Sequence, residues 1–327
     1  MRYYASRQPT TTRPLRAGLL VCLAMAACKG EKKPTPPAES PAIEIALAGA
    51  AVMIGAGDIA MCGKTGDEQT AAIIDSVLKA DSAANVKDVA ITIGDNVYSV
   101  GSAREFVSCF TPSWGDSHKR IMKSVRPSPG NHDYDSRGAE PYFQYFGSRA
   151  GPGRRGYYSY DIGDWHVVSL NSELPANSGR LVAAKAQDDW LQKDLAQNRK
   201  QCTVAYFHRP LFSSGDHGNS PSMRKLWDIM YANGVDLVLN GHDHHYERFL
   251  PQTPAGVADS ARGIAQIIVG TGGGTLRGVS SPRISNSASA VHGYYGVLKL
   301  SLGAGEYRHA FLDTRGRIWD EGGGKCH

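Results

Sequence analysis

Residues 240–248 read Asn240-Gly241-His242-Asp243-His244-His245-Tyr246-Glu247-Arg248 and contain three histidines within four positions. The apolar run Val235 to Leu239 precedes them and predicts a buried strand that ends at Gly241, where glycine lets the backbone turn sharply. His242 and His244 are two positions apart, so their side chains point to the same side of an extended segment. Two imidazoles on one side of a strand end are typical of a metal site. The alternative is a polar loop with incidental histidines.

Other side chains that suit metal ions follow further predicted strands. They are Asp58 after Ala51–Gly57, Asp95 and Tyr98 after Val89–Gly94, Asn131 and His132 after Gly130, and His208 at the end of Cys202–Phe207. In α/β proteins, ligands bind in the crevice outside the carboxyl ends of the strands. A single aspartate at a strand end is often only a helix cap, but capping does not explain the whole set. The pattern therefore predicts a metal centre at one edge of a sheet.

The order of these motifs carries a family resemblance. The motifs are Gly57-Asp58, Gly94-Asp95-Asn96-Val97-Tyr98, Gly130-Asn131-His132-Asp133, His208 and Gly241-His242-Asp243-His244. They resemble the motifs of the calcineurin-like metallophosphoesterases and, within that family, those of the purple acid phosphatases. The similarity spans Ala51 to about Glu247. It implies an α/β fold in which two packed, mixed β-sheets are flanked by helices.

The resemblance also implies two metal ions that share one carboxylate. Two metals about 3.5–4 Å apart can hold both the attacking water and the phosphate oxygens. The implied ligands are Asp58, Asp95, Tyr98 and His244 for Fe(III), and Asp95, Asn131, His208 and His242 for a divalent Zn, Mn or Fe ion.

Tyr98 is the reason for expecting ferric iron. Many metallophosphoesterases have a histidine where this chain has Ala60, and this chain has Tyr98 where they often have an aspartate. A phenol with a pKa of about 10 binds a metal well only when a strong Lewis acid displaces its proton. With Asp58, Asp95, Tyr98 and a bridging hydroxide as anions, an Fe(III)–divalent pair leaves a net positive site that attracts phosphate. The alternative is that Tyr98 only packs.

Several side chains are expected to contact the substrate. His132 is adjacent to Asn131, and neighbours on an extended segment point apart, so His132 is expected to face the substrate as a general acid or a phosphate clamp. His217 resembles a substrate histidine of the family, with an exposed loop histidine as the alternative. Arg209 and Arg248 are candidate phosphate clamps, or else form salt bridges at the rim, and Asn131 is a further candidate for contact with the substrate.

The predicted activity is hydrolysis of phosphate monoesters by a metal-dependent, acid phosphatase-like enzyme that uses a metal-bound hydroxide as nucleophile. A phosphodiesterase or nucleotide hydrolase needs the same ligands and is the alternative. A catalytically dead surface binding protein is a second alternative, although a dead site is expected to have lost ligands.

The chain divides into three predicted segments. Residues 1–27 read as an export signal, because a basic segment precedes an apolar run too short to span a bilayer. Residues 28–48 form a Pro-rich tether, and residues 49–327 form a single catalytic domain. The net charge of +5 without a clustered basic stretch argues against nucleic acid as a partner.

The cysteines predict a membrane anchor and two disulfides. Cys22 leaves with the signal and four cysteines can pair, which leaves Cys28 odd. Met25-Ala26-Ala27-Cys28 resembles a bacterial lipobox, so we expect an exported protein, periplasmic or on the outer cell surface, with a lipid anchor at Cys28. Cleavage after Ala24-Met25-Ala26, giving a soluble secreted protein, is the alternative. The predicted disulfides are Cys62–Cys109, both just past strands on the active-site side, and Cys202–Cys326.

Secondary structure is expected to change character along the chain. Helices predicted at Asp67–Ala80, Leu181–Ala196 and Met223–Ala232 alternate with strands, whereas strands dominate from Gly263 onward. Gly278 to Ala290 is rich in serine, lacks periodicity and is predicted to be a loop beside the site.

Overall fold

The computed structural model describes Leu47 and residues 49–327. The predicted signal peptide, nearly all of the tether and Cys28, the predicted site of lipidation, lie outside these residues. Within the described range, no helix is both long enough and apolar enough to cross a membrane.

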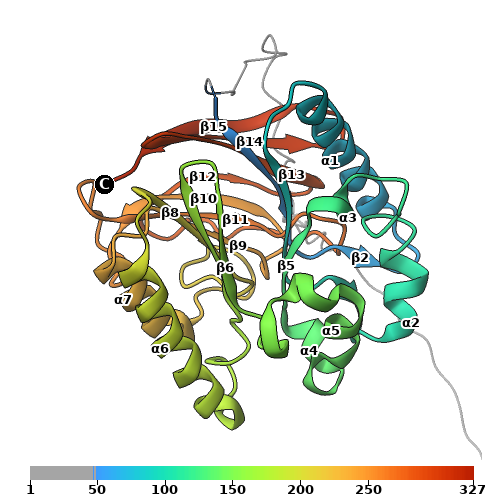
Figure 1. The fold of residues 1–327 in the computed structure, drawn as a ribbon, viewed down its shortest axis with the longest axis horizontal. Helices are drawn as coiled ribbons and strands as arrows, with labels where there is room; N and C mark the ends of the chain where they lie inside the picture. The colour runs from blue at the N-terminus through green and yellow to red at the C-terminus, as the bar shows by residue number, and fades with distance from the viewer. Residues whose placement is uncertain (1–46, 48) are drawn as a thin grey trace, which may run out of the picture. The chain divides into compact units, whose positions relative to one another are not determined.

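The first sheet has six strands in the order β15-β14-β13-β1-β3-β5 (Figure 1). Strands β1, β3 and β5 are parallel, and β13, β14 and β15 continue the sheet in antiparallel fashion. The bounds are β1 Ala51–Ala56, β3 Asp88–Ile93, β5 Arg126–Ser128, β13 Gly296–Gly303, β14 Glu306–Asp313 and β15 Ile318–Lys325.

The second sheet has seven strands in the order β12-β10-β11-β9-β8-β7-β6. Its centre, β7, β8, β9 and β11, is parallel. The bounds are β6 Tyr158–Ile162, β7 Trp165–Ser169, β8 Cys202–Tyr206, β9 Leu237–Asn240, β10 Tyr246–Gln252, β11 Ile264–Val269 and β12 Ser287–Val291. A small third sheet pairs β2 (Ala60–Met61) with β4 (Val97–Tyr98).

Along the strands of the second sheet, apolar side chains alternate between two buried faces, and this alternation explains the layered packing. Val204 and Leu239 belong to the core shared with the first sheet, whereas Ala205 and Val238 belong to a second core under α6 and α7. Successive side chains of a strand point to opposite faces. A sheet that is apolar on both faces must be covered on both, here by the other sheet and by helices. The predicted fold class, two mixed sheets flanked by helices, is therefore confirmed.

The helices lie close to their predicted positions. On α1, Ala71, Ile74 and Leu78 recur on one buried face, and α6 and α7 lie together over the second sheet (Figure 1). The bounds are α1 Gly66–Ala83, α2 Ala103–Glu105, α3 Ile121–Ser124, α4 Asn131–Asp135, α5 Glu140–Phe146, α6 Leu181–Gln197 and α7 Arg224–Ala232, with a π-helical turn at Phe106–Phe110.

The loop prediction for Gly278–Ala290 is wrong in its last part. Ser287–Val291 forms β12, an edge strand that pairs antiparallel with β10. The strand is rich in Ser and Ala and is mostly not buried, so no apolar alternation marks it in the sequence. It is held by backbone pairing and by the Ser287 hydroxyl, which donates to the buried Glu247 carboxylate.

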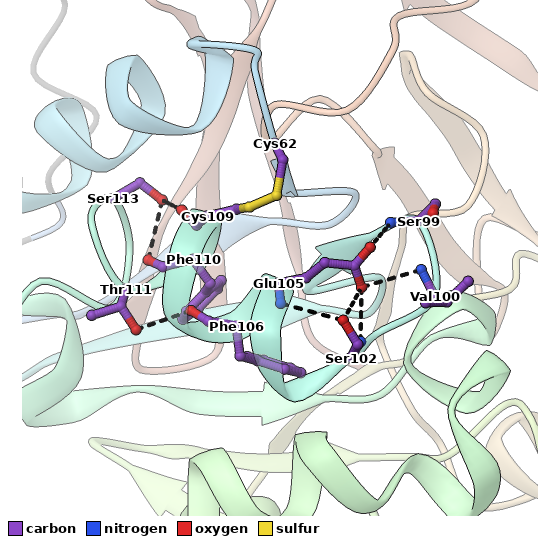
Figure 2. The surroundings of a disulfide bond; sticks show 10 residues. All are labelled: Cys62, Ser99, Val100, Ser102, Glu105, Phe106, Cys109, Phe110, Thr111 and Ser113. Carbon is purple, nitrogen blue, oxygen red and sulfur yellow. Dashed lines mark hydrogen bonds between the residues drawn. A yellow bond between two sulfur atoms is a disulfide. The ribbon is translucent and has the colours of Figure 1, made fainter.

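Both predicted disulfides are confirmed: Cys62–Cys109, with Cα atoms 5.1 Å apart, and Cys202–Cys326, with Cα atoms 5.4 Å apart. Figure 2 shows the first, which ties the segment after β2 to the π-helical turn. The second ties the start of β8 to the C-terminal end of the chain.

Candidate active site

Three candidate ligands follow the ends of parallel strands in a strained backbone conformation. Asp58, Asp95 and His242 have φ angles of 60°, 48° and 70°. This left-handed region is uncommon for residues other than glycine, and such strain gathers at functional sites. Gly94 precedes Asp95 because a Cβ there would lie 2.6 Å from the His208 ring. The turn at the end of β3 can therefore approach His208 only with glycine at this position.

Tyr98 lies at the centre of the first group of candidate ligands. Its Oη is 2.8 Å from Asp58 Oδ1, 3.1 Å from Asp95 Oδ2 and 3.2 Å from His244 Nε2. His244 Nε2 is also 3.1 Å from Asp58 Oδ1. All four side chains are buried. The structure thus brings together the four side chains expected to bind iron.

The second group shares Asp95 with the first. Asp95 Oδ2 is 3.2 Å from His208 Nε2, which is 3.3 Å from His242 Nδ1. The same carboxylate oxygen therefore touches a side chain of each group, as expected for a bridging ligand. Among the His, Cys, Asp and Glu side chains of the described residues, Asp58, Asp95 and His208 can place one ligand atom each within 4.8 Å of one another.

The fourth candidate ligand of the second group is Asn131. Its Oδ1 is buried and has no hydrogen-bond partner within the described structure. A buried amide oxygen normally has a partner. The Gly130 turn brings this segment against Asp95, because a Cβ on Gly130 would lie 2.2 Å from Asp95 Oδ1. The orphaned oxygen is what a missing cation beside Asp95 would leave.

The candidate ligands suit metal ions because their contacting oxygen and nitrogen atoms carry more lone pairs than protons. His244 Nδ1 lies 2.6 Å from the Thr275 carbonyl and His208 Nδ1 lies 2.9 Å from the Ile93 carbonyl. Each Nδ1 therefore carries a proton, and when the ring is neutral the lone pair of Nε2 points at a carboxylate oxygen. Only an added proton or a cation makes such contacts favourable.

The charges of the candidate ligands also favour a bound cation. Burial disfavours ionisation of Asp58 and Asp95, yet neighbouring imidazoles hold the pKa of both carboxyl groups below its ordinary value. Burial lowers the pKa of His208, but the carboxylates of Asp95 and Asp58 raise it to about 10. Burial and the same two carboxylates raise the pKa of the Tyr98 phenol well above its usual range. A cation among these groups would favour the ionised phenol.

His132 stands beside the site, but not for the predicted reason. Asn131 and His132 lie in helix α4 rather than on an extended segment, so that premise is wrong. The His132 Nδ1 donates to the Ser99 carbonyl at 2.6 Å and lies 3.1 Å from Asp135 Oδ2. Its Nε2 is 3.9 Å from Asp95 Oδ2, and the side chain is 34% exposed. One ring nitrogen is thus fixed by the protein and the other is available to a substrate.

The loop that holds His132 is itself held by Glu105 (Figure 2). The Glu105 carboxylate accepts from the backbone N–H groups of Ser99, Val100 and Ser102 and from the Ser102 hydroxyl. This loop begins directly after Tyr98, so Glu105 orders the connection between a candidate metal ligand and His132.

His217 has a buried partner that the sequence analysis missed. Its Nδ1 and its backbone N–H are each 2.9 Å from Asp243 Oδ1, and Asp243 is fully buried. The His217 ring lies 4.4 Å from the His242 ring and 6.4 Å from the His244 ring, measured between centroids. Because Nδ1 donates to Asp243, Nε2 remains free beside both candidate ligands. The pairing crosses 26 residues, and nothing in the local sequence marks it.

Arg209 is fixed by a buried glutamate. Its guanidinium donates to both carboxylate oxygens of Glu173, at 2.8 and 3.3 Å, and its Nη1 donates to His242 Nε2 at 3.1 Å. Arg209 therefore faces the site, whereas Arg248 is turned to Asp320 of β15 and has a structural contact.

At the carboxyl ends of the strands of this two-sheet α/β fold, two aspartates, a tyrosine and three histidines converge. This arrangement defines the site of a metal-dependent phosphoesterase. The sequence pattern of the calcineurin-like phosphoesterase family matches residues 54–246. The chain belongs to that family, which confirms the resemblance seen in the sequence.

Purple acid phosphatases are among its relatives. Purple acid phosphatase 15 of Arabidopsis thaliana is 28% identical over 198 residues, which cover 50% of this chain and 36% of that protein. Acid phosphatase type 7 of Homo sapiens is 27% identical over 202 residues, covering 53% and 43%. The chain spans less than half the length of these relatives.

Solved structures share the fold. Purple acid phosphatase from yellow lupin seeds has a TM-score of 0.71 at 18% identity, over 84% of this chain and 53% of that chain. GAP50, the anchor in the inner membrane complex of Plasmodium, has a TM-score of 0.67 at 14% identity, over 85% and 89%.

Proposed function

We propose that this protein hydrolyses phosphate monoesters at a dinuclear metal centre. The observation that carries the proposal is the position of Asp95 Oδ2, 3.1 Å from Tyr98 Oη in one group of ligands and 3.2 Å from His208 Nε2 in the other. Asp58 and His244 complete the first group, and His242 together with the unpaired Asn131 oxygen completes the second. Metal ions held by these side chains would supply positive charge that acidifies water and attracts the phosphate oxygens.

We propose Fe(III) for the group that contains Tyr98 and a divalent Zn, Mn or Fe ion for the other. The support is chemical. Burial and two carboxylates oppose loss of the Tyr98 proton, and a trivalent ion overcomes that opposition better than a divalent one.

The remaining polar groups favour a monoester over a diester. His132 and His217 each have one ring nitrogen fixed by the protein, which leaves Nε2 for the substrate. Arg209 adds a guanidinium on the side of His242. The terminal phosphate of a monoester has three non-bridging oxygens to accept these contacts, whereas a diester has two.

In the reaction, a water oxygen bonds to phosphorus while the bond to the leaving oxygen breaks, giving inorganic phosphate and an alcohol. His132 is placed to deliver the proton that the leaving oxygen needs. Arg209 and His217 hold the phosphate oxygens in line.

The experiment compares turnover of nitrophenyl phosphate and bis-nitrophenyl phosphate by wild type and by Asp95→Asn, each as metal-free and metal-loaded protein. The expected result is monoester turnover that needs metal and falls by several orders of magnitude in the variant. Preferential turnover of the diester would establish the phosphodiesterase alternative. Metal binding without any turnover would indicate a binding protein.

We also propose that the protein is exported and held at a membrane through a lipid on Cys28. The two disulfides support an oxidising compartment outside the cytosol. Fractionation of cells that express wild type or Cys28→Ser tests the anchor. The variant should move from the membrane to the soluble fraction, and a wild type that is already soluble would favour the secreted form.

A further inference from the structure

Arg180 contacts two residues that are linked to candidate substrate residues: Glu173, which binds Arg209, and Tyr134, which follows His132 in α4. Its Nη1 donates to the backbone carbonyl of Glu173 at 3.2 Å, and its guanidinium carbon lies 4.2 Å from the centre of the Tyr134 ring. Tyr134 follows His132 by two residues in helix α4. The arginine therefore packs directly on the element that carries His132.

Glu173 links Arg180 to the rest of the site. The same glutamate that accepts from Arg180 through its carbonyl binds Arg209 through its carboxylate. In a glutamate, standard covalent geometry places the backbone carbonyl oxygen and the carboxylate about 6 Å apart. The guanidinium groups of Arg180 and Arg209 therefore lie within about 12 Å of each other. Arg209 in turn touches His242.

Arg180 differs from Arg209 in lacking a counter-ion. Arg209 is neutralised by Glu173, whereas Arg180 pairs with no carboxylate among the described residues. Only one of its five N–H donors has a protein acceptor. A guanidinium that is stacked on an aromatic ring and partly shielded from solvent is pre-organised to bind a phosphate through two donors.

We propose that Arg180 forms a second anion subsite, which binds a second phosphate group carried by the leaving group of the substrate. The proposal rests on the proposed phosphomonoesterase activity and narrows its substrates to small organic molecules with two phosphate esters. One phosphate is hydrolysed at the metal centre while the other, several ångströms away on the same molecule, is held by Arg180.

Butane-1,4-diol monophosphate and butane-1,4-diol bisphosphate test the subsite because they differ only in the second phosphate. One charge-assisted hydrogen bond contributes about 1.5–3 kcal/mol, so wild type should prefer the bisphosphate by at least tenfold in kcat/KM, mostly through KM. In Arg180→Ala the preference should fall to about twofold, the statistical value for two equivalent phosphates. Turnover of nitrophenyl phosphate, which has no second phosphate, should stay unchanged.

Two matched variants separate the subsite from general effects of charge and folding. Arg180→Lys keeps the charge without the planar stack and should retain part of the preference. Arg149→Ala removes an exposed arginine away from the site and should retain all of it. Melting temperatures, measured in parallel, identify any variant that is simply less folded.

Calorimetric titration of the metal-free proteins with the same two compounds measures the subsite without turnover. The bisphosphate should bind wild type at least tenfold more tightly than the monophosphate, and Arg180→Ala should lose that difference. Equal ratios in wild type and Arg180→Ala would overturn the subsite. A wild type that binds the bisphosphate preferentially but hydrolyses neither compound would overturn the proposed function and leave the subsite standing.

Discussion

Replacing Arg209 by alanine should lower stability and activity for two separable reasons. The stability effect comes from Glu173, whose side chain is 6% exposed while that of Arg209 is 24% exposed. Removing one partner of a buried ion pair costs about 3–5 kcal/mol, because it leaves an uncompensated charge. Since Arg209 is partly exposed, water can reach the vacated space. We therefore expect the lower end, about 3 kcal/mol, or a fall in melting temperature of about 6 °C for a domain of this size.

The double variant Arg209→Ala/Glu173→Gln isolates the functional part. Glutamine has no charge to compensate, so most of the lost stability should return. The phosphate contact should not return. The expected loss in kcat/KM is about 10–100-fold, corresponding to one charge-assisted hydrogen bond of about 1.5–3 kcal/mol. Thermal unfolding and steady-state kinetics on nitrophenyl phosphate measure the two effects on the same preparations.

Two results would refute this reasoning. If the double variant regains full activity, Arg209 acts only as the counter-ion of Glu173 and does not contact the substrate. If Arg209→Ala unfolds at the wild-type temperature, the Glu173 carboxylate is not held by Arg209 in solution. Glu173→Gln alone is the control, since it removes the buried charge but keeps the guanidinium beside His242.

Four further predictions address other parts of the molecule. Tyr98→Phe should abolish the visible charge-transfer absorption of aerobically iron-loaded protein, and a wild type that is active, colourless and free of iron would exclude Fe(III). His132→Ala should lower kcat on an alkyl phosphate by roughly 10²–10⁴-fold and on nitrophenyl phosphate by distinctly less, because nitrophenolate leaves without a proton; equal losses would make His132 a clamp. Alanine at both Cys202 and Cys326 should lower the free energy of unfolding by roughly 3–5 kcal/mol, and denaturant unfolding that matches wild type would contradict this. Burial lowers the pKa of His166, but hydrogen bonds to two aspartates outweigh burial and raise this pKa above its ordinary value. The ring therefore stabilises the fold fully below the unfolded pKa of about 6.5, and this contribution is lost as pH rises through the higher folded pKa. His166→Gln should accordingly lower the free energy of unfolding more at pH 5.5 than at pH 9.

The ligand positions could be predicted because topology, rather than any particular contact, brings them together. Asp58, Asp95, His208 and His242 each stand just past a strand in the parallel part of a sheet. The carboxyl ends of parallel strands lie at one edge of each sheet, and the family resemblance implied that ligands from both edges share one metal centre. The disulfide Cys62–Cys109 was predicted because both cysteines come after strands on the active-site side, although Cys109 lies in the π-helical turn Phe106–Phe110 rather than directly past a strand.

The partners of the candidate substrate residues could not be predicted because they depend on how loops fold back. Asp243 binds His217 across 26 residues, and Glu173 binds Arg209 across 36. Each partner sits in a loop without periodicity. The edge strand β12 was missed for a related reason. Its pairing with β10 is made by the backbone, and half-exposed serines and alanines leave no pattern of apolar residues.

His132 lies beside the candidate site although its local structure was predicted wrongly. An extended segment would turn Asn131 and His132 to opposite sides, but both lie in helix α4, where neighbours are about 100° apart. That angle is still enough to keep the two side chains from sharing one ligand position. The His132 backbone N–H donates to Asp95 Oδ1 at 2.8 Å, and its ring is fixed through Nδ1 by the Ser99 carbonyl at 2.6 Å. The role of His132 therefore depends on its attachment to the chain segments of Asp95 and Tyr98, and this attachment, rather than the type of secondary structure, is what a substitution in the Ser99 loop would disturb.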